Sequence, residues 1–291
     1  MRIFIIAVFL SAWSTAHAWN ARGHMIMATI AYQQLSAEKK NTITEILKLH
    51  PEYHRSWKHD FNDLEDEVEL GLYLFMQASV WPDNIRNNKH PQHQYNGPKW
   101  HYMNYELRFP YNGNTDIVDQ YNVLQAIDLN KERYQAPSST PQEKAIALCW
   151  IIHLVGDIHQ PLHSVSLFNE EYPDGDRGGN RFWVKDRGSV NLHYYWDGLL
   201  GQSTGVRDIL NEVVLLKSEV QPTSQSSERD PTAWSLESFE LAREKVYLDG
   251  NLKGGKTKKE AAPLPKDYGM ESRKIGEKRI ALAGYRLANI L

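Results

Sequence analysis

The chain of 291 residues contains a single cysteine, Cys149, so no disulfide can form within it. Cys149 stands in the apolar segment ALCWIIH, where it is expected to act as a small core side chain. The lack of further cysteines also excludes a structural zinc site of the cysteine-rich kind. A metal site in this chain is therefore expected to use histidine and carboxylate side chains.

Long apolar runs are also scarce. The run at residues 3–10 is too short to span a bilayer, which takes about 20 helical residues. Arg2 precedes it, and small residues follow it up to Ala16-His17-Ala18, which fits the rule for signal peptide cleavage. The sequence thus predicts a signal peptide at residues 1–18 and Trp19 as the mature N-terminus. We expect an exported protein, periplasmic or secreted, with no membrane anchor after cleavage.

An excess of basic charge is missing as well. The chain carries 33 Lys and Arg against 36 Asp and Glu, a formal net charge of −3. This balance excludes a generally basic nucleic-acid-binding protein. A bound cluster of divalent cations would nevertheless make a local site positive.

Strand patterns are sparse, and helical periodicity dominates. Only RFWVKD, residues 181–186, resembles one arm of a short hairpin. The pattern Thr140-Pro141-x-Glu143 is a capping box that predicts where the central helix begins. We predict one mainly α-helical domain over residues 19–291, with helices at 24–35, 36–49, 64–79, 115–134, 140–160, 192–200, 206–218, 231–247 and 267–291.

The segment HLVGDIHQPLH, residues 153–163, has the spacing of metal ligands. His153 and Asp157 are four residues apart, so on a helix they project from one face. Pro161 ends the helix and is expected to turn His163 back toward that face. A lone pair of this kind could equally be a buried hydrogen-bonded pair, but His193 and Asp197 in NLHYYWD repeat the spacing.

Further candidate ligands stand in WNARGH, SVWPD and WHYMNY, beside tryptophan or glycine. Imidazole and carboxylate together suit zinc in a hydrolytic site. The candidates outnumber the ligands of one tetrahedral ion, so several ions must share them: His24, Asp83, His101, His153, Asp157, His163, His193 and Asp197.

With this ordered set of motifs, the chain resembles the class I nucleases, which are zinc-dependent and specific for single strands. The resemblance runs from Trp19 to GYRLAN at 284–289. It implies the single-domain helical bundle that these nucleases share with the zinc phospholipases C, with a cleft holding three Zn²⁺. Matching positions imply one ion at Asp83, His101, His153 and Asp157, a second at Trp19, His24 and Asp157, and a third at His163, His193 and Asp197.

The resemblance also implies the activity. We expect a monomeric endonuclease without an obligate protein partner, which cleaves single-stranded DNA and RNA to 5′-phosphate products and acts on 3′-nucleotides. A metal-activated hydroxide would attack phosphorus, with Asp157 bridging two ions and Arg86 contacting phosphate. Tyr102 would stack on a base. Asn104, where better-known members carry an aspartate, and Asn180 are further candidates for substrate contact.

Two alternatives remain open from the sequence. One is a zinc phospholipase C-like phosphodiesterase, although Asp197 stands where those enzymes place a glutamate. The other is a non-enzymatic exported zinc-binding protein, which would need a coordinatively closed site. The remaining mature histidines are expected to bind no metal: His50, His54, His59, His90, His93 and His159.

Overall fold

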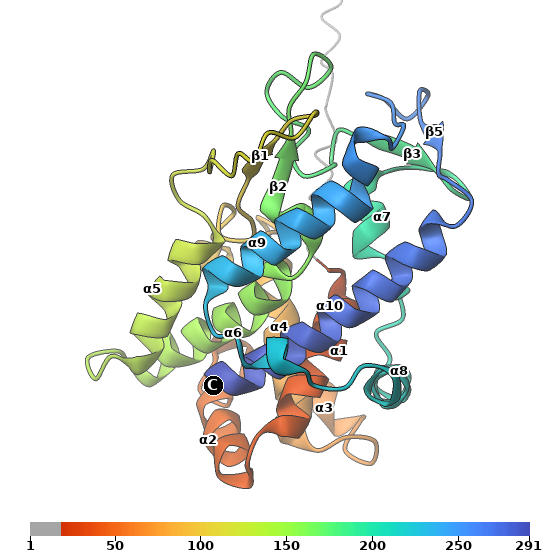
Figure 1. Ribbon diagram of the computed structural model, residues 1–291. Coiled ribbons are helices and arrows are strands. Elements are labelled where there is room, and N and C mark those ends of the chain that lie inside the picture. The colour runs from red at the N-terminus through yellow and green to blue at the C-terminus, as the bar shows by residue number, and fades with distance from the viewer. Residues whose placement is uncertain (1–18) are drawn as a thin grey trace, which may run out of the picture.

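A computed structural model describes residues 19–291 and is mainly helical, in a single domain, as the sequence predicts (Figure 1). The α-helices are α1 (Ala21–Gln34), α2 (Ala37–Leu47), α3 (Lys58–Asn62), α4 (Leu70–Asn84), α5 (Val123–Gln135), α6 (Pro141–Ile158), α7 (Leu192–Asp197), α8 (Val206–Glu219), α9 (Pro231–Leu241) and α10 (Tyr268–Ile290). Short 3-10 or π turns join several of them: η1 (Tyr53–Trp57), η2 (His93–Tyr95), η3 (Pro161–Ser164), η4 (Ser224–Ser227), η5 (Ala242–Val246) and η6 (Leu248–Gly250).

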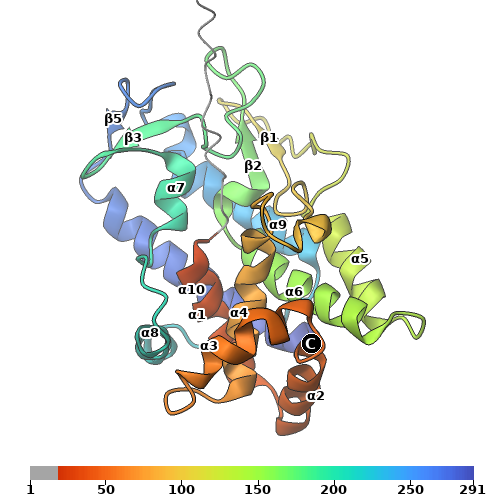
Figure 2. The ribbon, with the colours of Figure 1, turned by 180° about the vertical axis from the view of Figure 1, so that it is seen from behind.

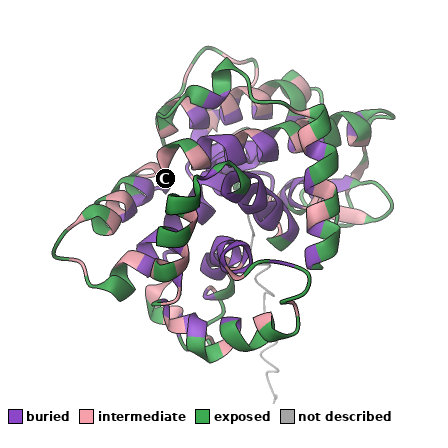
Figure 3. Ribbon diagram, turned by 90° about the horizontal axis from the view of Figure 1, so that it is seen from below, coloured by how far each residue is buried: buried purple, intermediate pink, exposed green. Residues whose placement is uncertain are grey.

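Helix α6 is the buried centre of the molecule. Every residue from Ala145 to Ile158 is buried. Helices α1, α4, α5 and α10 pack against it, and Figures 1 and 2 show this arrangement from opposite sides. In Figure 3 the buried segments gather in the middle, while exposed residues line the outer helices. Because α6 has no solvent-facing side over this length, any polar group on it must find a partner inside the protein.

Both ends of α6 are set by local hydrogen bonds. The Thr140 side chain accepts from the Glu143 backbone N–H at 3.2 Å, and the Glu143 carboxylate accepts from the Thr140 N–H at 2.7 Å, so the predicted capping box is present. At the other end the Gln160 side chain accepts from the Leu162 N–H at 2.5 Å. Pro161 then starts η3, which turns the chain back beside α6.

The strands are few and short. β1 (Tyr105–Leu107) pairs in parallel with β2 (Val165–Leu167). β3 (Trp183–Lys185) and β4 (Ser189–Asn191) form the hairpin that RFWVKD predicts, and β5 (Ala262–Pro263) joins β3 in parallel. The first pair ties the segment after His101 to the segment after His163.

Two predicted helices have different limits in the structure. The helix predicted at 115–134 begins only at Val123, because Asn122 caps it and Ile117 instead forms a β-bridge with Tyr105. The helix predicted at 64–79 runs from Leu70 to Asn84. It continues through Pro82, which stands in the last turn, so the prediction ended too early and Asp83 is helical.

The sequence did not predict helical structure between 53 and 62, where η1 and α3 lie. The helix predicted at 231–247 also changes character, because α9 ends at Leu241 and continues as the π turn η5. Hydrophobic periodicity alone does not distinguish these hydrogen-bond patterns.

The predicted signal peptide, residues 1–18, lies outside the described residues. Within 19–291, no helix has the length and apolar character needed to cross a membrane. Trp19 is buried, with 1% of its surface exposed. Asn20 caps α1, and the Arg22 guanidinium donates to the Leu200 carbonyl at 2.6 Å and to Glu212 at 3.1 Å. These bonds fix the start of α1 against the chain that follows α7.

A buried ionic cluster joins α9 and α10 to the end of α6. Arg286, fully buried, donates to Glu237 at 2.7 Å and contacts the His159 ring at 2.9 Å. Arg279 donates to Glu237 at 2.8 Å and to the His159 carbonyl at 3.1 Å. Burial raises the pKa of Glu237, but the hydrogen bonds from Arg286 and Arg279 outweigh it and lower this pKa.

We predict that Glu237→Gln lowers the free energy of unfolding by about 3 kcal/mol at pH 7, because it leaves the Arg286 charge buried without a counter-ion. A lowered carboxyl pKa stabilises the fold above the unfolded value and loses that effect as pH falls through the folded value. The difference between wild type and variant should therefore shrink below about pH 4. Urea unfolding at several pH values measures it.

The matched control is Glu271→Gln, which removes an exposed carboxylate that pairs with Lys274 on α10. It should change stability by less than about 1 kcal/mol. Equal effects of the two substitutions would contradict the structural role of the buried cluster.

Candidate metal centre

Three groups of histidine and aspartate side chains converge at the C-terminal end of α6. In each group the possible ligand atoms lie within 4.8 Å of one another. The groups draw on α1, α4, α6, η3, α7 and the loop before β1: His24, His153 and Asp157; Asp83, His101 and His153; His163, His193 and Asp197. All eight side chains that the sequence singles out as ligands are thus brought together.

Asp157 stands between the first two groups. Its Oδ2 lies 3.0 Å from His101 Nδ1 and 3.1 Å from His153 Nε2, while its Oδ1 lies 3.3 Å from His24 Nε2. Asp83 Oδ1 lies 3.8 Å from the same nitrogens of His101 and His153. Since a carboxylate has two oxygens, Asp157 can face two cations at once.

The donor set fits zinc. Ligands about 2.0–2.1 Å from a tetrahedral ion are separated by about 3.3 Å, close to the spacings in these groups. Buried atoms of the set also lack hydrogen bonds: both ring nitrogens of His24, Nε2 of His101 and Oδ1 of Asp157. Burying several polar atoms without partners is costly, and a cation would satisfy those that face the group centre.

Backbone carbonyls fix the orientation of three ligand rings. Nδ1 of His153 lies 2.7 Å from the Ser79 carbonyl, Nδ1 of His163 lies 2.5 Å from the His101 carbonyl, and Nδ1 of His193 lies 2.6 Å from the Gly178 carbonyl. When Nδ1–H donates to a carbonyl, Nε2 carries the lone pair and can bind a metal. Each of these three rings therefore presents Nε2 to its group.

In the third group the side chain of Gln160 orients the carboxylate of Asp197, a contact that the sequence did not predict. His163 Nε2 and His193 Nε2 are 3.1 Å apart, and Asp197 Oδ2 lies 3.7 Å from His193 Nε2. Gln160 donates to Asp197 Oδ1 at 2.7 Å, while its own oxygen accepts from Leu162. One amide therefore shapes the helix end and orients a ligand carboxylate.

Burial and charge set the protonation of the site. Burial lowers the pKa of His153, but the Asp157 and Asp83 carboxylates outweigh it and raise this pKa to about 9. Burial would raise the pKa of Asp157, yet the charge of His153 and the hydrogen bond from His101 hold it well below its usual value. An arriving cation must displace the His153 proton, so metal binding should release protons.

A glycine makes room for the first group. The rings of His24 and His153 stack with centroids 4.1 Å apart, which brings α1 close to α6. A Cβ at Gly156 would lie 2.7 Å from His24 Nδ1, closer than van der Waals contact allows. Any larger residue at 156 must push His24 away from Asp157.

We predict that Gly156→Ala loses about one zinc ion per chain and costs about 1–3 kcal/mol of stability, because the added methyl group overpacks the contact with His24. Elemental analysis of the purified protein and a thermal melt measure the two effects. Gly188→Ala is the control, since a Cβ there meets nothing within 4 Å. Full zinc content in Gly156→Ala would contradict this account.

The expected substrate-binding residues are partly exposed beside the cluster. Nη1 of Arg86 lies 3.3 Å from Oδ1 of Asp83. Asn104 donates to Asp119 at 2.6 Å, and Asp119 is a carboxylate that the sequence analysis missed. Burial raises the pKa of Tyr102, and the nearby Asp119 charge adds to this. Asp119 thus lies near both Tyr102 and Asn104, although it stands in the segment wrongly predicted as helix.

Asn180 has a local contact: it donates to the Arg177 carbonyl at 2.8 Å, in the loop that also supplies the Gly178 carbonyl to His193. The histidines expected to bind no metal lie outside the three groups. His50, for example, stacks on Trp57 with centroids 4.6 Å apart, and burial lowers its pKa to about 3. His159 packs into the cluster of Arg279 and Arg286, away from the ligands.

The helical fold and the clustered imidazoles and carboxylates fit a metal-dependent hydrolase. A family model described as S1/P1 Nuclease matches residues 19–291, and the chain belongs to this family. It is a nuclease, a hydrolase acting on phosphodiester bonds, as the class I motifs predict.

Several similar proteins are also named as nucleases. Endonuclease 4 of Arabidopsis thaliana is 28% identical over 95% of this chain and 89% of its own length. Endonuclease 1 of the same plant is 25% identical over 98% of this chain and 89% of its own length. Nuclease S1 of Aspergillus oryzae is 30% identical over 52% of this chain and 55% of its own length. These matches favour a nuclease over the phospholipase C-like and non-enzymatic alternatives.

Proposed function

We propose that this chain is an exported, monomeric endonuclease that uses three zinc ions to hydrolyse single-stranded DNA and RNA to 5′-phosphate products, with 3′-nucleotidase activity. The observation that supports this most strongly is the convergence of three His and Asp groups on one end of α6, with Asp157 between two of them.

The proposed ligand sets follow these groups. Asp83, His101 and His153, with Asp157 beside them, would hold one ion, and His163, His193 and Asp197 would hold another. His24 and Asp157 hold the remaining ion together with the amine and carbonyl of Trp19. Asn20 donates its backbone N–H to the Asp197 carbonyl at 3.2 Å, so the start of the domain lies beside α7. An amine can complete this set only after cleavage at Ala18.

Bound zinc would supply Lewis acidity that acidifies a water and polarises the phosphate. The residues of the chain place the substrate. Arg86, beside Asp83, offers a planar fork of donors to a phosphate. Tyr102 provides a partly exposed ring on which a base can stack, worth about 1–3 kcal/mol. Asp119 holds the amide of Asn104, which leaves the Asn104 oxygen to accept from a base, and Asn180 contributes a further amide.

A direct test compares four substrates with the processed protein: RNA, single-stranded DNA, duplex DNA and phosphatidylcholine. We expect close to three zinc ions per chain and hydrolysis of RNA and single-stranded DNA that stops on chelation and returns with zinc. Full activity in a metal-free preparation, or a preference for phosphatidylcholine, would overturn the proposal.

The bridging position of Asp157 makes a quantitative prediction. Asp157→Asn should lose more zinc than any other single ligand substitution, about two ions per chain, and nearly all activity, because an amide oxygen is a weak ligand and two ions depend on this side chain. Asp83→Asn, which touches one group, is the comparison within the site. Elemental analysis that finds all zinc retained in Asp157→Asn would rule out a bridge.

Zinc content and activity should depend on cleavage between Ala18 and Trp19. A protein that retains Ala18 in front of Trp19 has an amide where the mature protein has an amine, so we expect the loss of about one zinc ion and of activity without loss of the fold. Mass spectrometry defines the N-terminus, and circular dichroism checks the helices. Normal turnover by the blocked protein would remove Trp19 from the site.

A further inference from the structure

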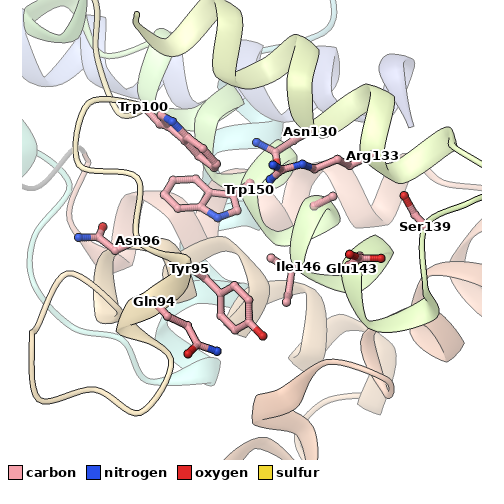
Figure 4. A pocket seen from close by; sticks show the side chains of 11 residues that line it. Gln94, Tyr95, Asn96, Trp100, Asn130, Arg133, Ser139, Glu143, Ile146 and Trp150 are labelled. Carbon is pink, nitrogen blue, oxygen red and sulfur yellow. The ribbon is translucent and has the colours of Figure 1, made fainter.

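A pocket lies apart from the ligand groups, between α5, the N-terminal half of α6 and residues 94–100 (Figure 4). Its volume is about 450 Å³, within the range of small-molecule sites. None of its lining residues belongs to the three ligand groups described above. The proposed zinc chemistry therefore leaves this pocket unexplained.

Aromatic rings form one side of the pocket. The Trp100 and Trp150 rings meet edge to face with centroids 4.6 Å apart, and Tyr95 and Ile146 extend the apolar surface. Trp150 is almost fully buried, while Trp100 and Tyr95 are partly exposed. Such a surface accepts the face of a planar ring, because stacking on an aromatic side chain tolerates any heterocycle.

An unpaired acceptor is the second feature. Asn130 is fully buried, and its amide donates to the Ala126 carbonyl at 2.8 Å, but its Oδ1 has no hydrogen-bond partner. Asn96 also lines the pocket, but Figure 4 shows its amide directed away from Asn130 and the two Trp rings. In Figure 4 the Asn130 side chain points from α5 toward the Trp150 ring. An unpaired acceptor beside aromatic rings calls for a planar ligand with an N–H donor.

A positively charged side chain at the edge of the pocket is the third feature. Arg133, one turn after Asn130 on α5, is exposed and lines the pocket. The acidic residue in the lining, Glu143, is already occupied by the backbone N–H and hydroxyl of Thr140. The hydrogen bonds from Thr140 lower the pKa of Glu143, and the Arg133 charge adds to this. The guanidinium of Arg133 suits a phosphate.

Helix α6 connects this pocket with the ligand groups. Glu143, Ile146 and Trp150 line the pocket, and His153 and Asp157 follow at the same helical spacing on the same face. Asp157 follows Trp150 by seven positions, about 10 Å along the helix axis. The Trp150 ring also contacts the His101 ring, with centroids 5.3 Å apart. Trp150 is therefore a wall common to both sites.

We propose that this pocket binds a nucleotide: an amino-bearing base lies against Trp100 and Trp150, its amino group donates to Asn130 Oδ1, and its phosphate pairs with Arg133. This rests on the proposed function, since a nuclease that releases 5′-phosphates meets such ligands continuously. The nucleotide comes either from the bound strand or from released product, and the same variants distinguish these sources.

The test titrates the zinc-loaded protein with 5′-AMP in a calorimeter. Wild type should bind two molecules per chain, one at the zinc site and one in this pocket. Asn130→Leu removes the acceptor and should abolish the second binding event, while its melting temperature stays equal or rises, because an unpaired buried acceptor is lost. Arg133→Gln should weaken that event about tenfold. Arg229→Gln, an exposed arginine in the loop before α9, is the control.

Ligand chemistry sharpens the test. Inosine 5′-phosphate, which lacks the amino group, should bind the pocket at least about tenfold more weakly than 5′-AMP. If strands supply the nucleotide, Asn130→Leu should raise KM for short single-stranded oligomers but not for 3′-AMP. If released product supplies the nucleotide, Asn130→Leu should change neither the KM for oligomers nor the KM for 3′-AMP.

A single binding event in wild type, or two events that survive in both Asn130→Leu and Arg133→Gln, would overturn the proposal and leave a water-filled pocket. The proposed function fails separately: if the chain binds 5′-AMP through Asn130 and Arg133 but does not hydrolyse single strands, the pocket stands and the three-zinc nuclease does not.

Discussion

The buried carboxylate of Asp157 is the constraint on which the rest of this structure depends. It is fully buried yet ionised, because His24, His101 and His153 surround it with imidazole nitrogens at 3.0–3.3 Å. A charge in this position is tolerated only with close polar partners. His153 supplies a positive charge, while burial lowers the pKa values of His24 and His101, which contribute polar ring nitrogens. Helix α1, which carries His24, and the loop before β1, which carries His101, must therefore meet at one point of α6.

The surrounding structure supports that arrangement through few but specific contacts. Three backbone carbonyls orient His153, His163 and His193, and the Gln160 amide orients Asp197. Gly156 lets α1 approach α6 closely enough for His24 to face Asp157. On the far side of the same helix end, Arg279 and Arg286 bind His159 and Glu237 and fix α9 and α10. The helix end is thus held from both sides.

Several of these features could be predicted from residue patterns alone, and others could not. The capping box of α6 and the turn at Pro161 are local, so the sequence predicts them correctly. The start of α5 was misplaced because Ile117 pairs with Tyr105, a contact that depends on the distant strand pairing of β1 and β2. The hydrogen bond between Asn104 and Asp119 could not be predicted either, because it depends on the same long-range contact and not on the spacing of the two residues in the sequence.

The sequence by itself determined the chemistry: which histidines and aspartates are available, in what order, and on which helix faces, because ligand type and helical spacing are local properties. The tertiary structure decided their grouping. That His24 reaches Oδ1 of Asp157, that Gln160 orients Asp197, and that Oδ1 of Asn130 has no hydrogen-bond partner all follow from helices packing at particular distances. Such contacts join residues far apart in the chain, so their geometry exists only in the folded protein.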